Sequence, residues 1–115
     1  MHHMKKITFK ELPEFQKDFK RLVKKYPSLP NDLELRKSVL EHFPKGRGID
    51  VDQIPNLKIH SKIYKARIEC RSLRQDSLRL IYCYDEDISV ITMIEIYFKG
   101  EQKLESRDRI FNNFS

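Results

Sequence analysis

Basic and apolar side chains alternate along one stretch in the middle of the chain, and this alternation constrains the fold more than any other feature. From Tyr64 to Arg71, the even positions hold tyrosine, alanine, isoleucine and cysteine, while the odd positions hold lysine, arginine, glutamate and arginine. A β-strand places successive side chains on opposite faces. The pattern therefore predicts a strand that buries one face and presents the other as a cationic row.

The alternation lies within a strongly basic segment. Residues 58–79 hold seven basic and two acidic side chains, a net charge of +5 out of +6 for the chain. The basic residues are Lys58, Lys62, Lys65, Arg67, Arg71, Arg74 and Arg79. Cations on a rigid sheet attract a polyanion, so we expect this face to bind a nucleic-acid backbone. Residues 80–115, by contrast, carry a net charge of −3.

The length and composition are those of one compact domain with a heavily charged surface. The chain has 115 residues, 39% hydrophobic and 35% charged. We assign residues 4–115 to this domain and interpret residues 1–3 as the remnant of an expression tag. No apolar run reaches the roughly 20 residues of a membrane span. Cys70 and Cys83 lack metal-ligand spacing and lie in apolar segments, which predicts buried free thiols in a reducing cytoplasm.

The first half of the chain predicts a short strand followed by two helices. Residues 7–9 form the expected strand, and Pro13 suits the first turn of a helix over about residues 12–25. Its apolar stripe consists of Phe15, Phe19, Leu22, Val23 and Tyr26. Ser28 is the expected N-cap of a second helix that ends before Pro44. The predicted inward residues of this helix are Leu33, Val39, Leu40 and Phe43.

The second half predicts three strands, over about residues 62–72, 78–85 and 88–99, after an irregular segment over residues 44–57. In the last strand, alternate positions from 90 to 98 are expected to share one face. A short terminal helix should pack through Leu104, Ile110, Phe111 and Phe114. The predicted fold class is α+β: an N-terminal strand, and an α-helical hairpin packed on a mostly antiparallel four-stranded sheet, with a short C-terminal helix.

Hydrophobic alternation also predicts how the first two of these three strands pair. A register with Arg67 opposite Cys83 puts Lys65, Arg67 and Arg79 on one face. The same register puts Cys70 and Cys83 on opposite faces, which excludes a disulfide between them.

Three motifs resemble the RelE-like branch of the RelE/ParE toxin superfamily, the toxins of type II toxin–antitoxin systems. They are Tyr64-Lys65-Ala66-Arg67, Arg79-Leu80-Ile81-Tyr82 and the strand ending in Phe98-Lys99-Gly100-Glu101. The resemblance implies a cytoplasmic mRNA endoribonuclease that needs no metal or cofactor and inhibits translation. It further implies mRNA and the ribosome as partners, and a cognate antitoxin that neutralises the toxin.

In this family the ribose 2′-OH attacks the adjacent phosphate and leaves a 2′,3′-cyclic phosphate and a 5′-OH. The chemistry needs a proton acceptor, cations on the phosphate oxygens and an acid for the departing oxygen. By resemblance, Lys65 and Arg67 lie where the base and the phosphate-holding pair are found. Arg79 matches the family's strand arginine, and Lys99 lies near its leaving-group acid.

Further candidates for RNA binding are Lys62, Arg71, Tyr97 and His60. Tyr97 is expected to replace a terminal tyrosine that stacks on a base in RelE, and His60 is a candidate general base because histidine titrates near neutrality.

Each of these assignments has an alternative. For Lys65 and Arg67 it is a solvated strand face, and for Arg79 an internal partner such as Glu69 or Glu95. For the whole protein, the alternatives are a ParE-like toxin that inhibits gyrase and a non-catalytic domain whose basic sheet binds RNA.

Overall fold

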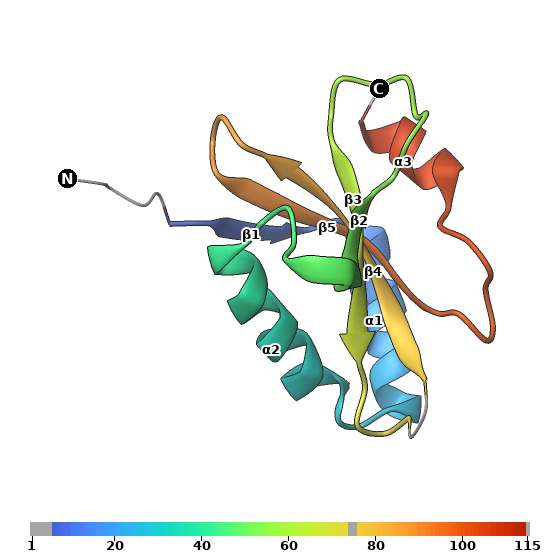
Figure 1. Ribbon diagram of the computed structural model, residues 1–115. Helices are drawn as coiled ribbons and strands as arrows, with labels where there is room; N and C mark the ends of the chain where they lie inside the picture. The colour runs from blue at the N-terminus through green and yellow to red at the C-terminus, as the bar shows by residue number, and fades with distance from the viewer. Residues whose placement is uncertain (1–5, 74–75, 115) are drawn as a thin grey trace.

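The computed structural model describes residues 6–73 and 76–114. The proposed tag remnant at residues 1–3 and the basic residue Arg74 lie outside the described residues. Two helices cover one face of a single sheet, and a third helix lies against the other face (Figure 1). Within the described residues, no helix is long and apolar enough to cross a bilayer.

The elements follow the predicted order, with one addition. They are β1 (Thr8–Glu11), α1 (Pro13–Lys25), α2 (Leu29–His42), a 3-10 turn (Gly48–Asp50), β2 (Val51–Gln53), β3 (Ile63–Glu69), β4 (Ser77–Asp85), β5 (Val90–Phe98) and α3 (Arg107–Asn113). The sheet order is β1-β5-β4-β3-β2, with β1 parallel to β5 and the other neighbours antiparallel.

The α+β fold class is confirmed, but the sheet has five strands where the sequence predicted four. The additional strand is β2, within the segment expected to be irregular. It pairs with β3 over three residues only, from Val51 opposite Ala66 to Gln53 opposite Tyr64. A strand of this length is too short to show an alternation of its own.

The predicted register between β3 and β4 is wrong, although the predicted faces are correct. Arg67 lies opposite Arg79, and Cys83 lies opposite Ile63. Cys83 is therefore four residues from the predicted partner, and an even shift leaves every side chain on its predicted face. Both cysteines are free and buried, and they belong to different hydrophobic clusters.

Hydrogen bonds from α2 explain why β3 ends earlier than predicted. The Asp32 carboxylate accepts the backbone N–H of Arg71 at 3.1 Å. The Ser28 hydroxyl, at the N-terminus of the same helix, accepts the backbone N–H of Ser72 at 2.9 Å. These bonds draw residues 70–72 away from the sheet, so that Glu69 and Ser77 form its last pair.

The main core lies between the sheet and the pair α1 and α2. Phe15 and Leu22 of α1 pack there with strand residues such as Ile68, Leu80 and Met93. The predicted stripe of α1 is confirmed, since all its members are buried or packed against this core. On α2, Leu33 and Leu40 are buried as predicted. The prediction is wrong for Val39 and Phe43, which are 42% and 40% exposed because they lie beyond the edge of the sheet contact.

A second core covers part of the opposite face, which the sequence had predicted to be an open cationic surface. It joins Ile63, Ile81 and Cys83 to Ile110 of α3 and to the segment before β3. Of the predicted packing residues of the terminal helix, Ile110 is buried and Phe114 packs against this core. Leu104 and Phe111 are 65% and 39% exposed, so these two assignments are wrong.

A β-bulge in β5 overturns the prediction that one face runs from Val90 to Phe98. Ile81 lies opposite Glu95 but the next residue, Tyr82, lies opposite Met93, so Ile94 is an extra residue. The alternation changes parity there, as expected when two residues oppose one. As a result Met93 and Ile96 both face α1 and α2, while Ile94 and Tyr97 enter the second core.

The burial of Ile68 predicts that a charge at this position unfolds the domain. Its side chain is 1% exposed in the main core. We expect Ile68→Asp to lose cooperative thermal unfolding, because an unpaired buried carboxylate adds several kcal/mol to the loss of apolar packing. Circular dichroism melting measures this. Ile88→Asp, the same change at a 63% exposed isoleucine, is the control and should melt like the wild type. A normal melting curve for Ile68→Asp would contradict the assigned faces of the sheet.

Candidate nucleic-acid interface

Three of the predicted catalytic residues meet in one small hollow beside β2. Its volume is about 170 Å³, and it is lined by Ile49, Asp50, Asp52, Lys65, Arg67 and Arg79. The pairing of strands explains the convergence, since Lys65 lies opposite Asp52 and Arg67 opposite Arg79. Lys65, Arg67 and Arg79 therefore form the cationic hollow, the name used below for this site.

One buried hydroxyl holds both arginines of the cationic hollow. Arg67 Nε donates to Ser77 Oγ at 3.0 Å, and Arg79 Nη1 donates to the same oxygen. Arg79 Nη1 also lies 3.4 Å from the carbonyl oxygen of Leu78. Ser77 is 1% exposed, so its position is fixed by the sheet. The two guanidinium groups are thus held at the same oxygen, with further N–H donors left for another ligand.

The predicted internal partners of Arg79 are not used. Within residues 6–73 and 76–114, neither Arg67 nor Arg79 forms an ion pair. Glu69 is exposed, and Glu95 binds the chain after β5 instead. Like charges directly opposite each other destabilise a sheet. Asp50 and Asp52 line the same hollow, but neither lies within 4.0 Å of either guanidinium group, so the two opposed arginines have no ion-pair partner among the described residues.

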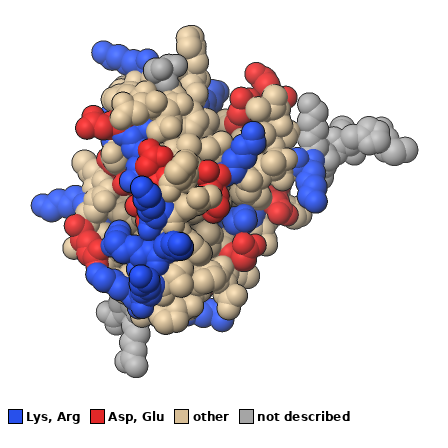
Figure 2. Space-filling model, turned by 180° about the vertical axis from the view of Figure 1, so that it is seen from behind, with Lys and Arg blue, Asp and Glu red and all other residues tan. Residues whose placement is uncertain are grey.

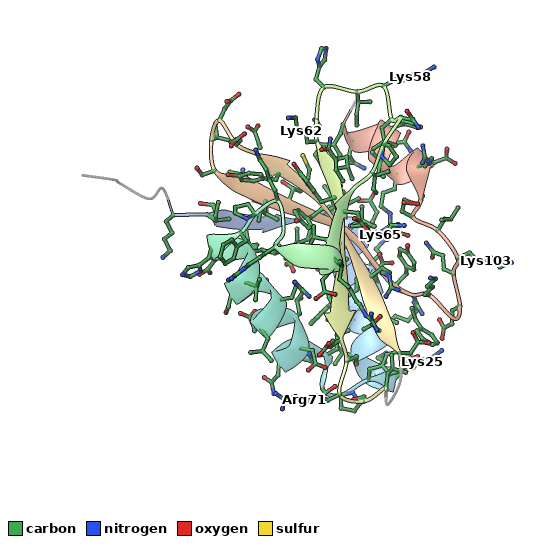
Figure 3. The ribbon with its side chains drawn as sticks, viewed as in Figure 1. Lys25, Lys58, Lys62, Lys65, Arg71 and Lys103 are labelled. Carbon is green, nitrogen blue, oxygen red and sulfur yellow. The ribbon has the colours of Figure 1, made fainter. Side chains whose placement is uncertain are left out.

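Lys65, the third cation of the hollow, is paired with a carboxylate. Its Nζ lies 3.1 Å from Oε1 of Glu105, and the two side chains are 27% and 4% exposed. Glu105 belongs to the segment between β5 and α3. Figure 3 shows Lys65 near the middle of the structure, between the ends where Lys62 and Arg71 lie.

The segment that carries Glu105 is fastened to the sheet on both sides of that residue. The buried carboxylate of Glu95 accepts the side-chain N–H of Gln102 and the backbone N–H of Ser106, each at 2.8 Å. Arg109 of α3 then donates to Asp18 of α1 at 2.6 Å and to the carbonyl oxygen of Ile94 at 3.0 Å. The chain between residues 102 and 109 is therefore held against β5.

Tyr97 lies beside Arg79 on the neighbouring strand and is a core residue. It is opposite Arg79 in the sheet and only 2% exposed. Burial raises the pKa of the Tyr97 hydroxyl most, and the charges of Glu105 and Glu95 add to this while that of Arg79 opposes it, so that the pKa is about 12. Because protein covers the ring, Tyr97 has no open face on which a base could stack.

The remaining candidates lie apart from the cationic hollow. Lys62 and His60 are exposed and line a different hollow, together with Cys83 and the turn after β4. The Arg71 guanidinium Nε lies 3.8 Å from Asp32 of α2, at the other end of β3. Lys99 is exposed in the turn after β5 and is not among the residues that line the hollow. The cations of the basic segment are thus distributed over several surfaces, and three of them, Lys65, Arg67 and Arg79, line one hollow.

A second basic surface lies on α1. Viewed from behind, Lys and Arg side chains gather over this helix (Figure 2). Lys17, Lys20 and Lys24 are exposed there, while Lys25 and Arg21 lie 3.0 Å and 3.6 Å from the carboxylate of Glu101. This surface is flat and solvated, as expected for charged residues on the outer face of a helix.

Sequence reasoning missed two residues that shape the site, Ser77 and Glu105, and it considered Glu95 only as a partner of Arg79, whereas Glu95 binds Gln102 and Ser106. The negative charge of residues 80–115 was a signal that the tail complements the basic middle, but it did not identify which carboxylate meets which cation. Ser77 carried no signal, because its role depends on the register that opposes Arg67 and Arg79. Among the described residues, no group of three or more His, Cys, Asp and Glu side chains is placed to hold a metal ion.

Among known proteins, a similar fold is found in one solved structure. No family model matches the sequence, and no curated protein matches it either. Among solved structures, the chain is similar to the Escherichia coli toxin RelE, an arginine-to-alanine double mutant in the free state. The TM-score is 0.57 at 13% sequence identity, over 86% of this chain and 90% of that one. The protein therefore has the RelE-like fold that its three motifs predicted.

The raised pKa of Tyr97 predicts a specific loss of stability at alkaline pH. A tyrosine of the unfolded chain titrates near pH 10, whereas Tyr97 titrates at about 12 when folded. Its contribution is complete below pH 10 and is lost as the pH rises towards 12. We expect the wild type to lose about 1 kcal/mol more than Tyr97→Phe between pH 8 and pH 11. Urea unfolding at both pH values measures the difference. Tyr26→Phe controls for the loss of a hydroxyl, and an identical pH dependence in wild type and Tyr97→Phe would contradict the assigned environment.

Proposed function

We propose that this protein is the toxin of a type II toxin–antitoxin system and that it cleaves mRNA without a metal ion. The observation that carries the proposal is the cationic hollow, in which Arg67 and Arg79 share the hydroxyl of Ser77 and Lys65 lies beside them. The RelE-like fold supports it, because the similar solved structure is that of a toxin.

The hollow suits the charge that develops when RNA is cleaved by its own 2′-OH. In that reaction the phosphate passes through a pentacoordinate state with more negative charge on its oxygens than the starting diester. Arg67 and Arg79 hold these oxygens through the guanidinium N–H groups that Ser77 leaves free. Donors fixed in advance stabilise the transition state without the cost of reorganisation. The 2′-OH releases its proton to solvent water as its oxygen bonds to phosphorus, the bond from phosphorus to the 5′ oxygen breaks, and the products are a 2′,3′-cyclic phosphate and a 5′-OH.

The other candidates take peripheral roles in this proposal. Lys65, paired with Glu105, supplies the third positive charge at the phosphate. Lys99 lies in the turn after β5, outside the hollow, and its exposed side chain extends from there to donate a proton to the departing 5′ oxygen. Lys62 and Arg71 lie towards opposite ends of the structure (Figure 3) and contact the nucleotides on either side of the cleaved bond. Placing these groups along β3 and β5 accommodates an extended RNA strand.

A cognate antitoxin, the ribosome and a cytoplasmic location complete the proposal. The net charge of +6 favours RNA and an acidic protein partner. Exposed apolar side chains on and after α2 favour a protein partner as well; they are Leu35, Val39, Phe43 and Ile49. We propose that the antitoxin covers these apolar residues and places carboxylates near the cationic hollow.

Removing one guanidinium from the hollow tests the proposal. We expect Arg79→Ala to abolish growth arrest and to lower RNA cleavage about a hundredfold, because one preorganised donor is lost from the transition state. Arg107→Ala, at an exposed arginine of α3, is the matched control and should keep full activity. Circular dichroism of both purified variants checks the fold. Full toxicity of a folded Arg79→Ala protein would contradict the nuclease assignment.

Mapping of transcript ends separates the proposed function from its alternatives. Primer extension on RNA from cells expressing the protein should show new breaks positioned by codon. Induction of the DNA-damage response without such breaks would indicate a toxin that inhibits gyrase. RNA binding with neither response would indicate a non-catalytic RNA-binding domain.

A further inference from the structure

The C-terminal segment reaches the cationic hollow through a single side chain. Glu105 is the only carboxylate within 4.0 Å of a cation of the hollow in the described part of the chain. Its side chain is 4% exposed, so it is a buried charge and not a surface group that happens to lie nearby. A carboxylate in such a place is costly unless it is paired. Its ion pair with Lys65 is therefore a fixed part of the fold.

We propose that Glu105 is a positioning residue for Lys65. Its carboxylate holds the ammonium at the edge of the hollow, so that Lys65, Arg67 and Arg79 face one phosphate group together. This inference rests on the proposed function, and it adds the chain after β5 to the machinery of that site.

The chemistry of lysine explains why such a partner is useful. A free lysine side chain loses rotamer entropy when it is held in one conformation. Glu105 fixes the side chain before RNA arrives, so that this cost falls on folding and not on RNA binding. An ammonium has three N–H donors. The contact with Glu105 is an ion pair to one carboxylate oxygen, which leaves N–H donors of the ammonium for the phosphate.

The support behind Glu105 is rigid enough for this role. Gln102 and Ser106, on either side of it, both donate to the buried Glu95 carboxylate. Ile110 then anchors α3 in the second core. Ser77 accepts a hydrogen bond from both arginines, and Glu105 pairs with Lys65. Every cation of the hollow therefore contacts a partner within the protein.

The same ion pair also has the opposite interpretation, in which Glu105 covers the hollow and blocks it. If Glu105 competed with the phosphate for Lys65, its removal would raise RNA affinity and cleavage. If Glu105 positions Lys65, its removal lowers both. The two interpretations therefore differ in the sign of the effect.

The test is a double-mutant cycle between Lys65 and Glu105. Glu105→Ala and Glu105→Gln are made in the wild type and in Lys65→Ala. Cleavage is measured on a short single-stranded RNA, and binding on the same RNA with every ribose 2′-O-methylated so that it cannot be cut. Glu101→Gln, an exposed carboxylate of the same segment that pairs with Lys25 and Arg21, is the matched control. Thermal melting of each variant checks the fold.

We expect Glu105→Ala to lower cleavage about tenfold, since a misplaced group near the reacting phosphate costs roughly that much or more. Glu105→Gln, which keeps an oxygen for the ammonium, should lose less, and Glu101→Gln should lose nothing. In the Lys65→Ala background neither Glu105 substitution should have a further effect, because the group that Glu105 positions is absent.

Two results would overturn the inference. Equal losses with and without Lys65 would make Glu105 a purely structural residue, and increased binding or cleavage would make it a cover. If Glu105→Ala melts below the assay temperature, Glu105→Gln carries the comparison. Failure of the proposed function has a different signature: the wild type and Lys65→Ala would then bind and cut RNA equally, whatever residue stands at position 105.

Discussion

The antiparallel pairing of β3 with β4 is the constraint on which the rest of the structure depends. Its register sets Ala66 against Leu80 towards α1 and α2, and on the other face it sets Arg67 against Arg79. The apolar face supplies the core, and the cost of opposing two arginines falls on the other face, where Ser77 holds both. Asp50 and Asp52 line the same hollow, yet neither arginine forms an ion pair among the described residues. Local exceptions of this kind to the rules of sheet pairing are expected at functional sites.

The C-terminal segment contacts Lys65, the third cation of the hollow, on the same face of the sheet as the two arginines. It closes the second core through Ile110 and brings Glu105 to Lys65. The bulge at Ile94 shifts the parity of β5 and places Tyr97 opposite Arg79, in the second core that this segment closes. The residues of this segment therefore both stabilise the fold and determine where the charges of the hollow lie. Substitutions in residues 102–109 should alter the position of Lys65 in the hollow, even though Glu105 alone among them forms an ion pair with one of its cations.

Alternation in the sequence was sufficient to predict the fold class, the faces of β3 and β4, and the grouping of Lys65, Arg67 and Arg79. It could not predict the register, because registers that differ by an even number of residues put the same side chains on the same faces. Nor could it predict the bulge in β5, where one extra residue leaves the composition of the strand unchanged. The roles of Ser77 and Glu105 arise from contacts between distant segments, which no local pattern encodes.

The central claim is that the cationic hollow, and not the basic surface of α1, receives the RNA phosphate. NMR titration of the protein with a 2′-O-methylated, uncleavable single-stranded RNA tests this most directly, through the Nε–Hε signals of Arg67 and Arg79 and the backbone amides of α1. The account predicts that both arginine signals shift together and saturate with one RNA per protein, while the amides around Lys17, Lys20 and Lys24 move little. Large shifts along α1 with unchanged signals from Arg67 and Arg79 would contradict it.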